Sequence, residues 1–78
     1  MFLLEEEQKK NIRKARKALN GNKNVELFLY NKKYKIKALS ISNKLFFVSA
    51  LIDAGNFSYY QAFSFDTFNK KIQILIKD

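Results

Sequence analysis

The chain has 78 residues, enough for one domain with a thin core, and its 47% hydrophobic and 15% aromatic content indicates a packed fold. Fifteen Lys or Arg against seven Asp or Glu give a formal charge of +8, which attracts polyanions and does not specify a fold. Because Cys and His are both absent, disulfides, thiolate or imidazole metal sites, and catalysis by either residue are excluded.

Residues 3–19 are predicted to form a helix, because strong helix formers dominate and neither Gly nor Pro interrupts them. The residues that recur on one helical face are apolar apart from Gln8: Leu4, Ile12, Ala15 and Leu19. Acidic residues at the start and basic residues at the end suit the helix dipole, and Asn20-Gly21 is a normal stop signal.

Five strands are predicted in the rest of the chain, at about residues 24–76. The first covers residues 25–30, and a turn at residues 31–33 precedes a second strand, 34–38, whose alternation predicts one wet face. Residues 45–52 are almost wholly apolar, which predicts a strand covered on both sides. After a turn at residues 53–56, one face of a fourth strand carries Phe57, Tyr59, Phe63 and Phe65, and residues 72–76 form the fifth.

Catalysis is not expected. The carboxylates are Glu5 to Glu7, which suit a solvated helix start, and Glu26, Asp53, Asp66 and Asp78, of which Asp53 and Asp66 suit turns or strand ends. No glycine-rich phosphate loop exists, and no Ser has a His to activate it. We therefore expect no enzyme activity, no cofactor and no metal. The apolar start at Met1 is too short for a signal peptide, and no apolar run reaches membrane length, so we expect a cytoplasmic protein.

The basic residues fall into two groups, one on the predicted helix and one around the second strand: Lys9, Lys10, Arg13, Lys14, Arg16 and Lys17, and Lys32, Lys33, Lys35 and Lys37. Lys35 and Lys37 share a face, where they can track phosphates or block edge-strand aggregation. Adjacent Tyr59 and Tyr60 point to opposite faces, so one ring is expected outside, where bases could stack on it.

Gln61 is a polar residue on an otherwise apolar strand face, which it shares with Tyr59, Phe63 and Phe65. A polar amide in that position needs a hydrogen-bond partner or an opening to solvent. It either bonds to backbone at a strand end or points into a ligand groove at the rim of the fold.

Two segments resemble the motifs of the WYL domain. Residues 43–48 stand where its Trp-Tyr-Leu motif lies, in one of two registers, Leu45-Phe46-Phe47 or Phe46-Phe47-Val48. Residues 60–68 resemble its Tyr-Arg-Thr-Phe-Arg-Leu-Asp-Arg-Ile segment, and the resemblance spans about residues 12–76. It implies an Sm-like, SH3-type barrel that senses nucleic acid or nucleotides, as found in transcription regulators and attached to some DNA helicases.

The chain departs from that family at its charged positions. The Trp is missing, and Gln61, Ser64 and Thr67 replace three arginines whose bidentate phosphate contacts Gln cannot supply. Charge would instead come from lysines, namely Lys33, Lys35, Lys37 and Lys44. The element order is also similar to Hfq and other Sm-like RNA chaperones, with Asn31 in place of their Asn-Gly turn and Lys32 in place of its Gly.

The sequence therefore predicts a single domain over residues 1–78, mainly β with one N-terminal helix, as an Sm/SH3-like five-stranded barrel. The predicted function is a non-catalytic module that binds single-stranded nucleic acid, DNA in preference to RNA, in a helicase or regulator. Its predicted interface is Lys33, Lys35, Lys37, Lys44, Phe46, Phe47, Tyr60, Gln61 and Ser64. There are two alternatives: an Sm/Hfq-like RNA chaperone that forms a ring, and a protein-interaction domain of phage or plasmid type. The sequence does not decide the oligomeric state among monomer, dimer and ring.

Overall fold

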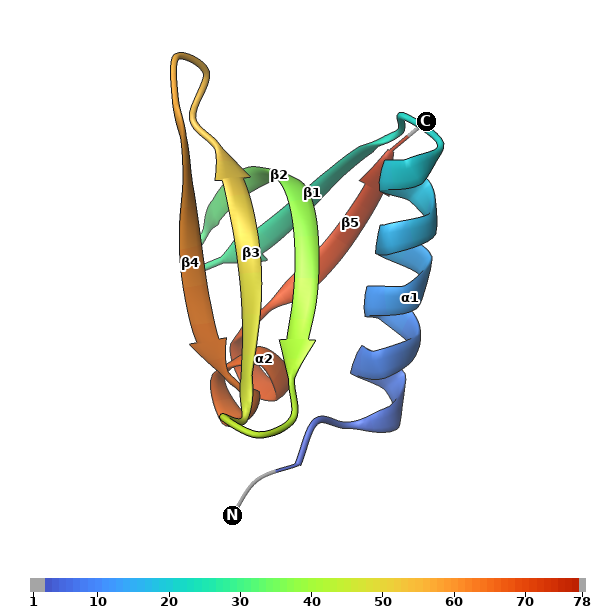
Figure 1. The fold of residues 1–78 in the computed structure, drawn as a ribbon, viewed down its shortest axis with the longest axis vertical. Helices are drawn as coiled ribbons and strands as arrows, with labels where there is room; N and C mark the ends of the chain where they lie inside the picture. The colour runs from blue at the N-terminus through green and yellow to red at the C-terminus, as the bar shows by residue number, and fades with distance from the viewer. Residues whose placement is uncertain (1–2, 78) are drawn as a thin grey trace.

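Five antiparallel strands and two helices make up the computed structural model (Figure 1). It describes residues 3–77, so the predictions made for Met1 and Asp78 lie outside the described residues. The elements in chain order are α1 (Glu6–Asn20), β1 (Asn24–Leu29), β2 (Lys32–Ser42), β3 (Phe47–Asp53), β4 (Ser58–Ser64), α2 (Phe65–Lys71) and β5 (Gln73–Lys77). The mainly β class and the N-terminal helix are confirmed, whereas the prediction of a single helix is wrong.

Helix α1 lies along one side of the sheet and packs on it through a narrow apolar stripe (Figure 1). Its buried residues are Gln8, Ile12, Ala15 and Ala18; the predicted start at residue 3 is wrong, because α1 begins at Glu6 and buried Leu4 precedes it. The helix ends where expected, because the backbone N–H groups of Gly21 and Lys23 bond back to the Ala18 carbonyl and Asn22 takes a left-handed φ of 60°. The basic residues of α1 are exposed, apart from Lys9, which is half-buried.

The strands form one sheet in the order β4-β3-β2-β1-β5, so β5 returns to pair with β1 across the sheet. Side chains such as Val25, Ile36 and Ile52 point inward and form the core, and we call this side of the sheet the core face. The opposite side is the outer face. Within residues 3–77, β4 and β5 are not paired, so the sheet is open and the predicted five-stranded barrel is not shown.

Strand β2 curves sharply on its way from β1 to β3 (Figure 1). Its first half pairs with β1 and its second half with β3, and the register shifts by one residue between Ile36 and Ala38. A β-bulge of this kind bends its strand and increases the local twist. Lys37 and Ala38 are both exposed as a result, and β2 continues to Ser42 instead of ending at residue 38.

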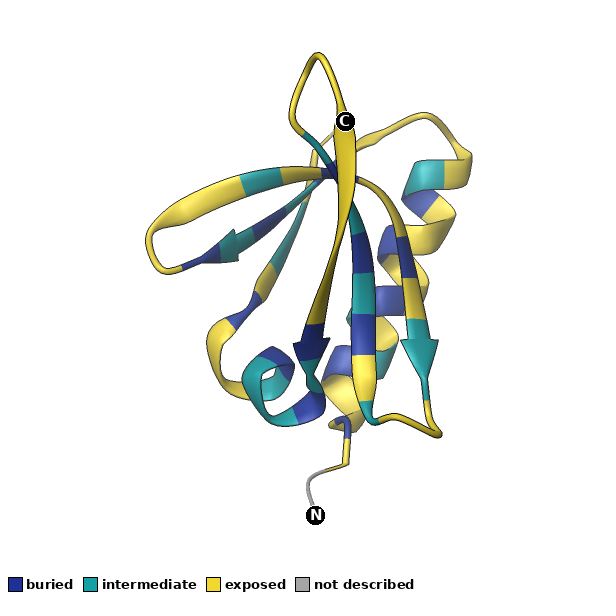
Figure 2. Ribbon diagram, turned by 60° about the vertical axis from the view of Figure 1, so that its left-hand side comes forward, coloured by how far each residue is buried: buried dark blue, intermediate teal, exposed yellow. Residues whose placement is uncertain are grey.

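Two predicted boundaries at the strand ends are wrong. The turn before β2 consists of Tyr30 and Asn31, both with positive φ, which is the two-residue type I′ geometry that suits the twist of a hairpin. Lys32 therefore already belongs to β2. Strand β3 starts at Phe47 and alternates between buried and partly exposed residues, so it is covered on the core face only (Figure 2).

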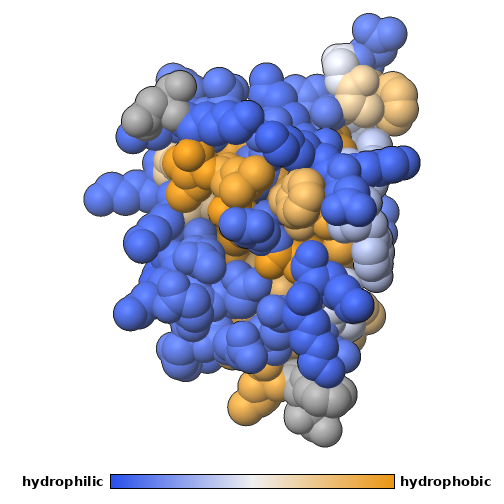
Figure 3. Space-filling view, turned by 180° about the vertical axis from the view of Figure 1, so that it is seen from behind, coloured by the Kyte–Doolittle hydropathy of each residue, from blue (hydrophilic) through white to orange (hydrophobic). Residues whose placement is uncertain are grey.

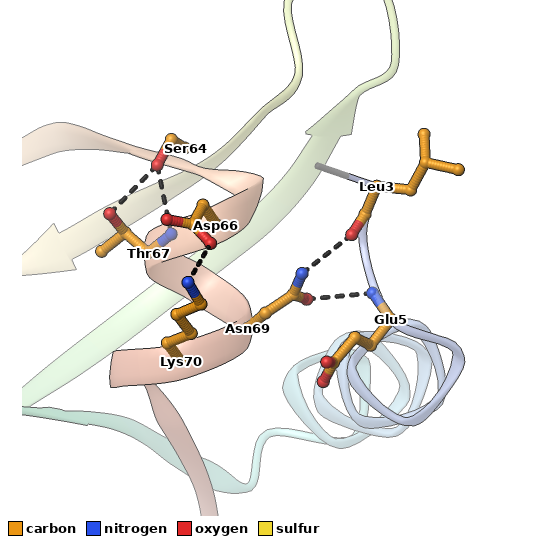
Figure 4. Close-up of polar contacts among 7 residues, drawn as sticks. All are labelled: Leu3, Glu5, Ser64, Asp66, Thr67, Asn69 and Lys70. Atoms are coloured by element: carbon orange, nitrogen blue, oxygen red, sulfur yellow. Dashed lines mark hydrogen bonds and ion pairs between the residues drawn. The ribbon is translucent and has the colours of Figure 1, made fainter. Parts of the chain in front are cut away.

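Helix α2 replaces the end of the predicted fourth strand. Ser64 caps it, because its Oγ accepts a hydrogen bond from the Thr67 N–H at 3.2 Å (Figure 4). Phe65 and Phe68 turn into the core from the first helical turns, so Phe65 does not continue the strand face of Tyr59 and Phe63. Phe57 precedes β4 and is likewise not part of it.

The two helices are tied together by side-chain amides. Buried Gln8 donates from Nε2 to the carbonyls of Phe68 at 2.8 Å and Ile72 at 3.0 Å. Asn69 bonds to the backbone of Leu3 and Glu5 just before α1 (Figure 4). The polar exception on the apolar stripe of α1 is thus a bridge to α2, and both amides fix how α1 approaches the sheet.

Candidate nucleic-acid interface

The outer face of β2 carries exposed lysines beside β1. Lys33 stands opposite Phe28 and Lys35 opposite Glu26, so both lysines lie on that face. Glu26 forms an ion pair with Lys77 of β5, 3.0 Å between Nζ and Oε1. The carboxylate of Glu26 offsets part of the positive charge near Lys35, and the stretch of β2 beyond the bulge has no acidic residue.

The bend of β2 brings Lys37 against the C-terminal half of α1. A groove of about 230 Å³ runs between the two elements and is lined by Arg16, Leu19, Asn20, Lys37, Ala38 and Leu39. One member of each basic group, Arg16 on the helix and Lys37 on the strand, therefore meet across this groove. We call this surface the basic groove.

An exposed aromatic ring lies in line with the bulge. Ala38 of β2 is paired with Leu51 of β3, and Leu51 is paired with Tyr60 of β4, so the three side chains form one transverse row on the outer face. Tyr60 is 76% exposed. Two strand spacings separate it from Ala38, roughly 10 Å. The row leads from a ring that nothing covers to the edge of the basic groove.

The predicted residues around the β2–β3 turn lie away from this row. Phe47 is 41% exposed on the outer face, four residues along β3 from Leu51, which is roughly 13 Å. Lys44 is exposed in the turn itself. Phe46 is half-buried with a φ of 60°, and its ring meets that of Phe65 edge-on at 5.9 Å. Its carbonyl accepts the N–H of Phe65, so Phe46 fixes the start of α2.

Ser64 is engaged within the fold. Its Oγ caps α2 and lies 3.0 Å from the hydroxyl of Thr67 (Figure 4). Asp66, in the first turn of the same helix, pairs with Lys70 at 3.0 Å. These bonds give Ser64 a structural role at the end of β4, three strand positions from the β4 residue Gln61.

Gln61 lies on the core face, beside the open side of the sheet. It lines a cavity of about 180 Å³ together with Leu29, Tyr34, Ile52, Tyr59 and Phe63. The predicted sharing of a face by Gln61, Tyr59 and Phe63 is confirmed. Because Tyr60 points to the other face, the structure divides the predicted residues of β4 between two sides of the sheet. The predicted interface included neither Tyr34 nor Tyr59, although both line this cavity.

Apolar side chains also occur on the outer face of β1 and β5, where Phe28 and Leu75 are half-buried. The back of the molecule shows a small apolar area edged by hydrophilic side chains (Figure 3). Asp53 accepts a hydrogen bond from the N–H of Gly55 in a turn, at 2.9 Å. Among the described residues, no three carboxylates gather as ligands for a metal ion.

Neither helix in the described part of the chain is long and apolar enough to cross a membrane. Comparison of the chain with protein-family models, with curated proteins and with solved structures found no match.

Proposed function

We propose that the chain is a non-catalytic module that binds single-stranded nucleic acid, DNA in preference to RNA, in the cytoplasm. The observation that carries the proposal is the transverse row that joins the exposed ring of Tyr60 to the basic groove at Lys37 and Arg16. Proteins that bind single strands combine a positive groove along the backbone with rings on which bases stack. Both parts are present here within roughly 10 Å.

Each part of the surface has a separate task in this proposal. Lys37 and Arg16 contact phosphates across the groove, and Lys35 extends the contacts along β2. Tyr60 stacks on a base and accepts any sequence, because every base has a π-face. Leu51 and Ala38 form the apolar floor between them. Since phosphate contacts release counterions, affinity falls as salt rises.

We also propose that the sheet is a variant of the Sm/SH3-like barrel. The strand order, the sharp bend of β2 and the short helix between β4 and β5 support a relative of the Sm/SH3-like barrel whose seam stays open. The WYL resemblance would then make the chain a regulatory or accessory module of a helicase or regulator. In that role the module holds a single strand while another domain acts on it.

A second candidate is a protein-interaction domain. It is favoured by a second groove of about 430 Å³ at the end of α1, where lysines surround an apolar floor. The groove is lined by Lys14, Lys17, Ala18, Gly21, Lys23 and Ile76. An acidic segment with one apolar side chain would fit that chemistry. Such a partner would bind without regard to nucleic acid.

The double variant K35A/K37A is expected to weaken binding of a single-stranded oligonucleotide and to reduce its salt dependence. If each lysine contacts one phosphate, the slope of log K against log salt falls in magnitude by about 1.4, because a single strand contributes about 0.7 per contact. Fluorescence anisotropy of a labelled oligonucleotide over a series of salt concentrations measures both quantities.

The matched control is K10A/K71A, which removes the same charge from two exposed positions that do not line the groove. It should keep a slope close to that of the unmodified protein. If the two double variants behave alike, net charge alone explains the binding, and the assignment of the groove is wrong.

A further inference from the structure

The cavity beside Gln61 lies on the opposite side of β4 from Tyr60, and the proposed single-strand path does not use it. It opens between the end of the β1–β2 hairpin and the edge strand β4, and we call it the seam pocket. Leu29 and Tyr34 line it from the hairpin, and Tyr59, Gln61 and Phe63 line it from β4. Phe57 extends the aromatic wall, because its ring lies 6.0 Å from that of Tyr59.

The seam pocket has the size of one small ring. Its volume is about 180 Å³, and an apolar cavity of roughly 150 Å³ holds one benzene molecule. A six-membered pyrimidine ring therefore fits, whereas a two-ring purine would project from the opening. Leu29, Ile52 and Phe63 supply apolar walls, and Tyr34 and Tyr59 supply ring faces.

Three polar side chains line this pocket, and two of them, Gln61 and Tyr59, are exposed to solvent. The side chains of Gln61, Tyr34 and Tyr59 form no hydrogen bond to any other residue of the described range 3–77. Ligand sites are typically apolar with a few polar groups that fix orientation. The Gln61 carboxamide offers one donor and one acceptor side by side, which matches the adjacent acceptor and donor on the pairing edge of a pyrimidine.

The position of the pocket also suits a nucleic-acid strand of which one base stacks on Tyr60, because the adjacent base of that strand could enter the pocket. Tyr59 and Tyr60 are consecutive on β4, an edge strand of the sheet that the described residues form, so a nucleic-acid chain can pass over this edge and meet both faces. Lys32 stands opposite Leu29 and shares the face of the pocket. An ammonium group is thus available for a phosphate beside it.

We infer that the seam pocket holds one pyrimidine base, with Gln61 bonded to the pairing edge of the base. The inference rests on the proposed function, because it takes the base to come from the bound single strand. It adds a sequence preference, for pyrimidine at one position, to a surface that otherwise accepts any base. A free pyrimidine nucleoside offers the same chemistry, and the experiment separates the two sources.

The test uses the full chain and two readouts. Anisotropy compares binding of oligothymidine and oligodeoxyadenosine of equal length to the unmodified protein and to Gln61→Leu. We expect the unmodified protein to bind oligothymidine more tightly than oligodeoxyadenosine. In Gln61→Leu the ratio of the two affinities should fall by about tenfold, in line with the value of a bidentate base contact. Gln73→Leu makes the same change at an exposed position of β5 and should leave the preference intact.

The second readout is the ¹⁵N–¹H signal of the Gln61 side chain during titration with free thymidine, with benzyl alcohol as a ring that lacks the pairing edge. A shift with thymidine and a much smaller one with benzyl alcohol supports the inference. If both shift the signal equally, or if neither does, Gln61 does not recognise a base edge and the inference is overturned.

The two readouts also separate this inference from the proposed function. Oligonucleotide binding with an unchanged preference in Gln61→Leu overturns the pyrimidine pocket and leaves the single-strand surface in place. A thymidine shift without any oligonucleotide binding supports the pocket, overturns the bound strand as the source of the base, and contradicts the proposed function.

Discussion

Phe68→Ala is expected to lower the free energy of unfolding by about 3–5 kcal/mol, the usual cost of emptying a fully buried phenylalanine site. Phe68 is 0% exposed and lies in α2 with its ring 6.4 Å from that of Phe63. A small domain has a total stability near the lower end of roughly 5–15 kcal/mol. The Phe68→Ala variant should therefore contain a population of unfolded chains near room temperature even without denaturant. Urea denaturation followed by far-ultraviolet circular dichroism measures this loss of stability.

Phe57→Ala is the matched control, because Phe57 is 63% exposed and contacts Tyr59 at the β3–β4 loop. Its loss should stay below about 1.5 kcal/mol, the upper value for one aromatic pair. Equal destabilisation by the two substitutions would contradict the placement of α2 against the core.

Gln8→Leu should destabilise the protein by about 1–3 kcal/mol, although it adds apolar surface and nearly preserves volume. Gln8 is 7% exposed, and its amide bonds to the carbonyls of Phe68 and Ile72. Leucine leaves these bonds unmade, so the carbonyls lose a partner where water has little access. The expected fall in melting temperature is roughly 4–8 °C per kcal/mol for a domain of this size.

Gln73→Leu serves as the control for this change as well. Gln73 is exposed on β5, and a surface substitution of that kind stays within about 0.5 kcal/mol. A stable Gln8→Leu protein with an unchanged melting temperature would show that the amide bridge between α1 and α2 contributes nothing to stability.

The first helix and the number of strands could be predicted because local signals agree there. The apolar stripe of α1 and the stop at Asn20-Gly21 both follow from short-range pattern. The second helix was missed because Phe63 and Phe65 alternate like one strand face. A helical signal was nevertheless present: Ser64 as a cap, with Phe65, Phe68 and Ile72 at helical spacing.

The bend of β2 had no such local signal. Alternation continues from Lys35 to Lys37, and Ala38 suits either face, so the bulge depends on how β1 and β3 pair on either side. The turn was misplaced because a type I′ turn favours Asn or Gly at both central positions, and Tyr30 occupies the first. The open edge between β4 and β5 is likewise set by long-range pairing.

The residue types of the candidate site and the side of the strand on which they lie could be predicted, but the way separate elements bring them together could not. Parity correctly placed Gln61 with Tyr59 and Phe63, and opposite to Tyr60. The approach of Arg16 to Lys37 depends on tertiary packing of α1 against the bend of β2, which no short-range pattern reveals. The roles of Phe46 and Ser64 at the start of α2 were hidden for the same reason that α2 was.

The most direct test of single-strand binding is fluorescence anisotropy with labelled single-stranded and duplex oligonucleotides, of DNA and of RNA, at two salt concentrations. We expect micromolar or tighter binding that favours single strands over duplex, favours DNA over RNA, and weakens as salt rises. No binding at low salt would contradict single-strand binding. The charge of +8 would then favour an acidic protein as the partner.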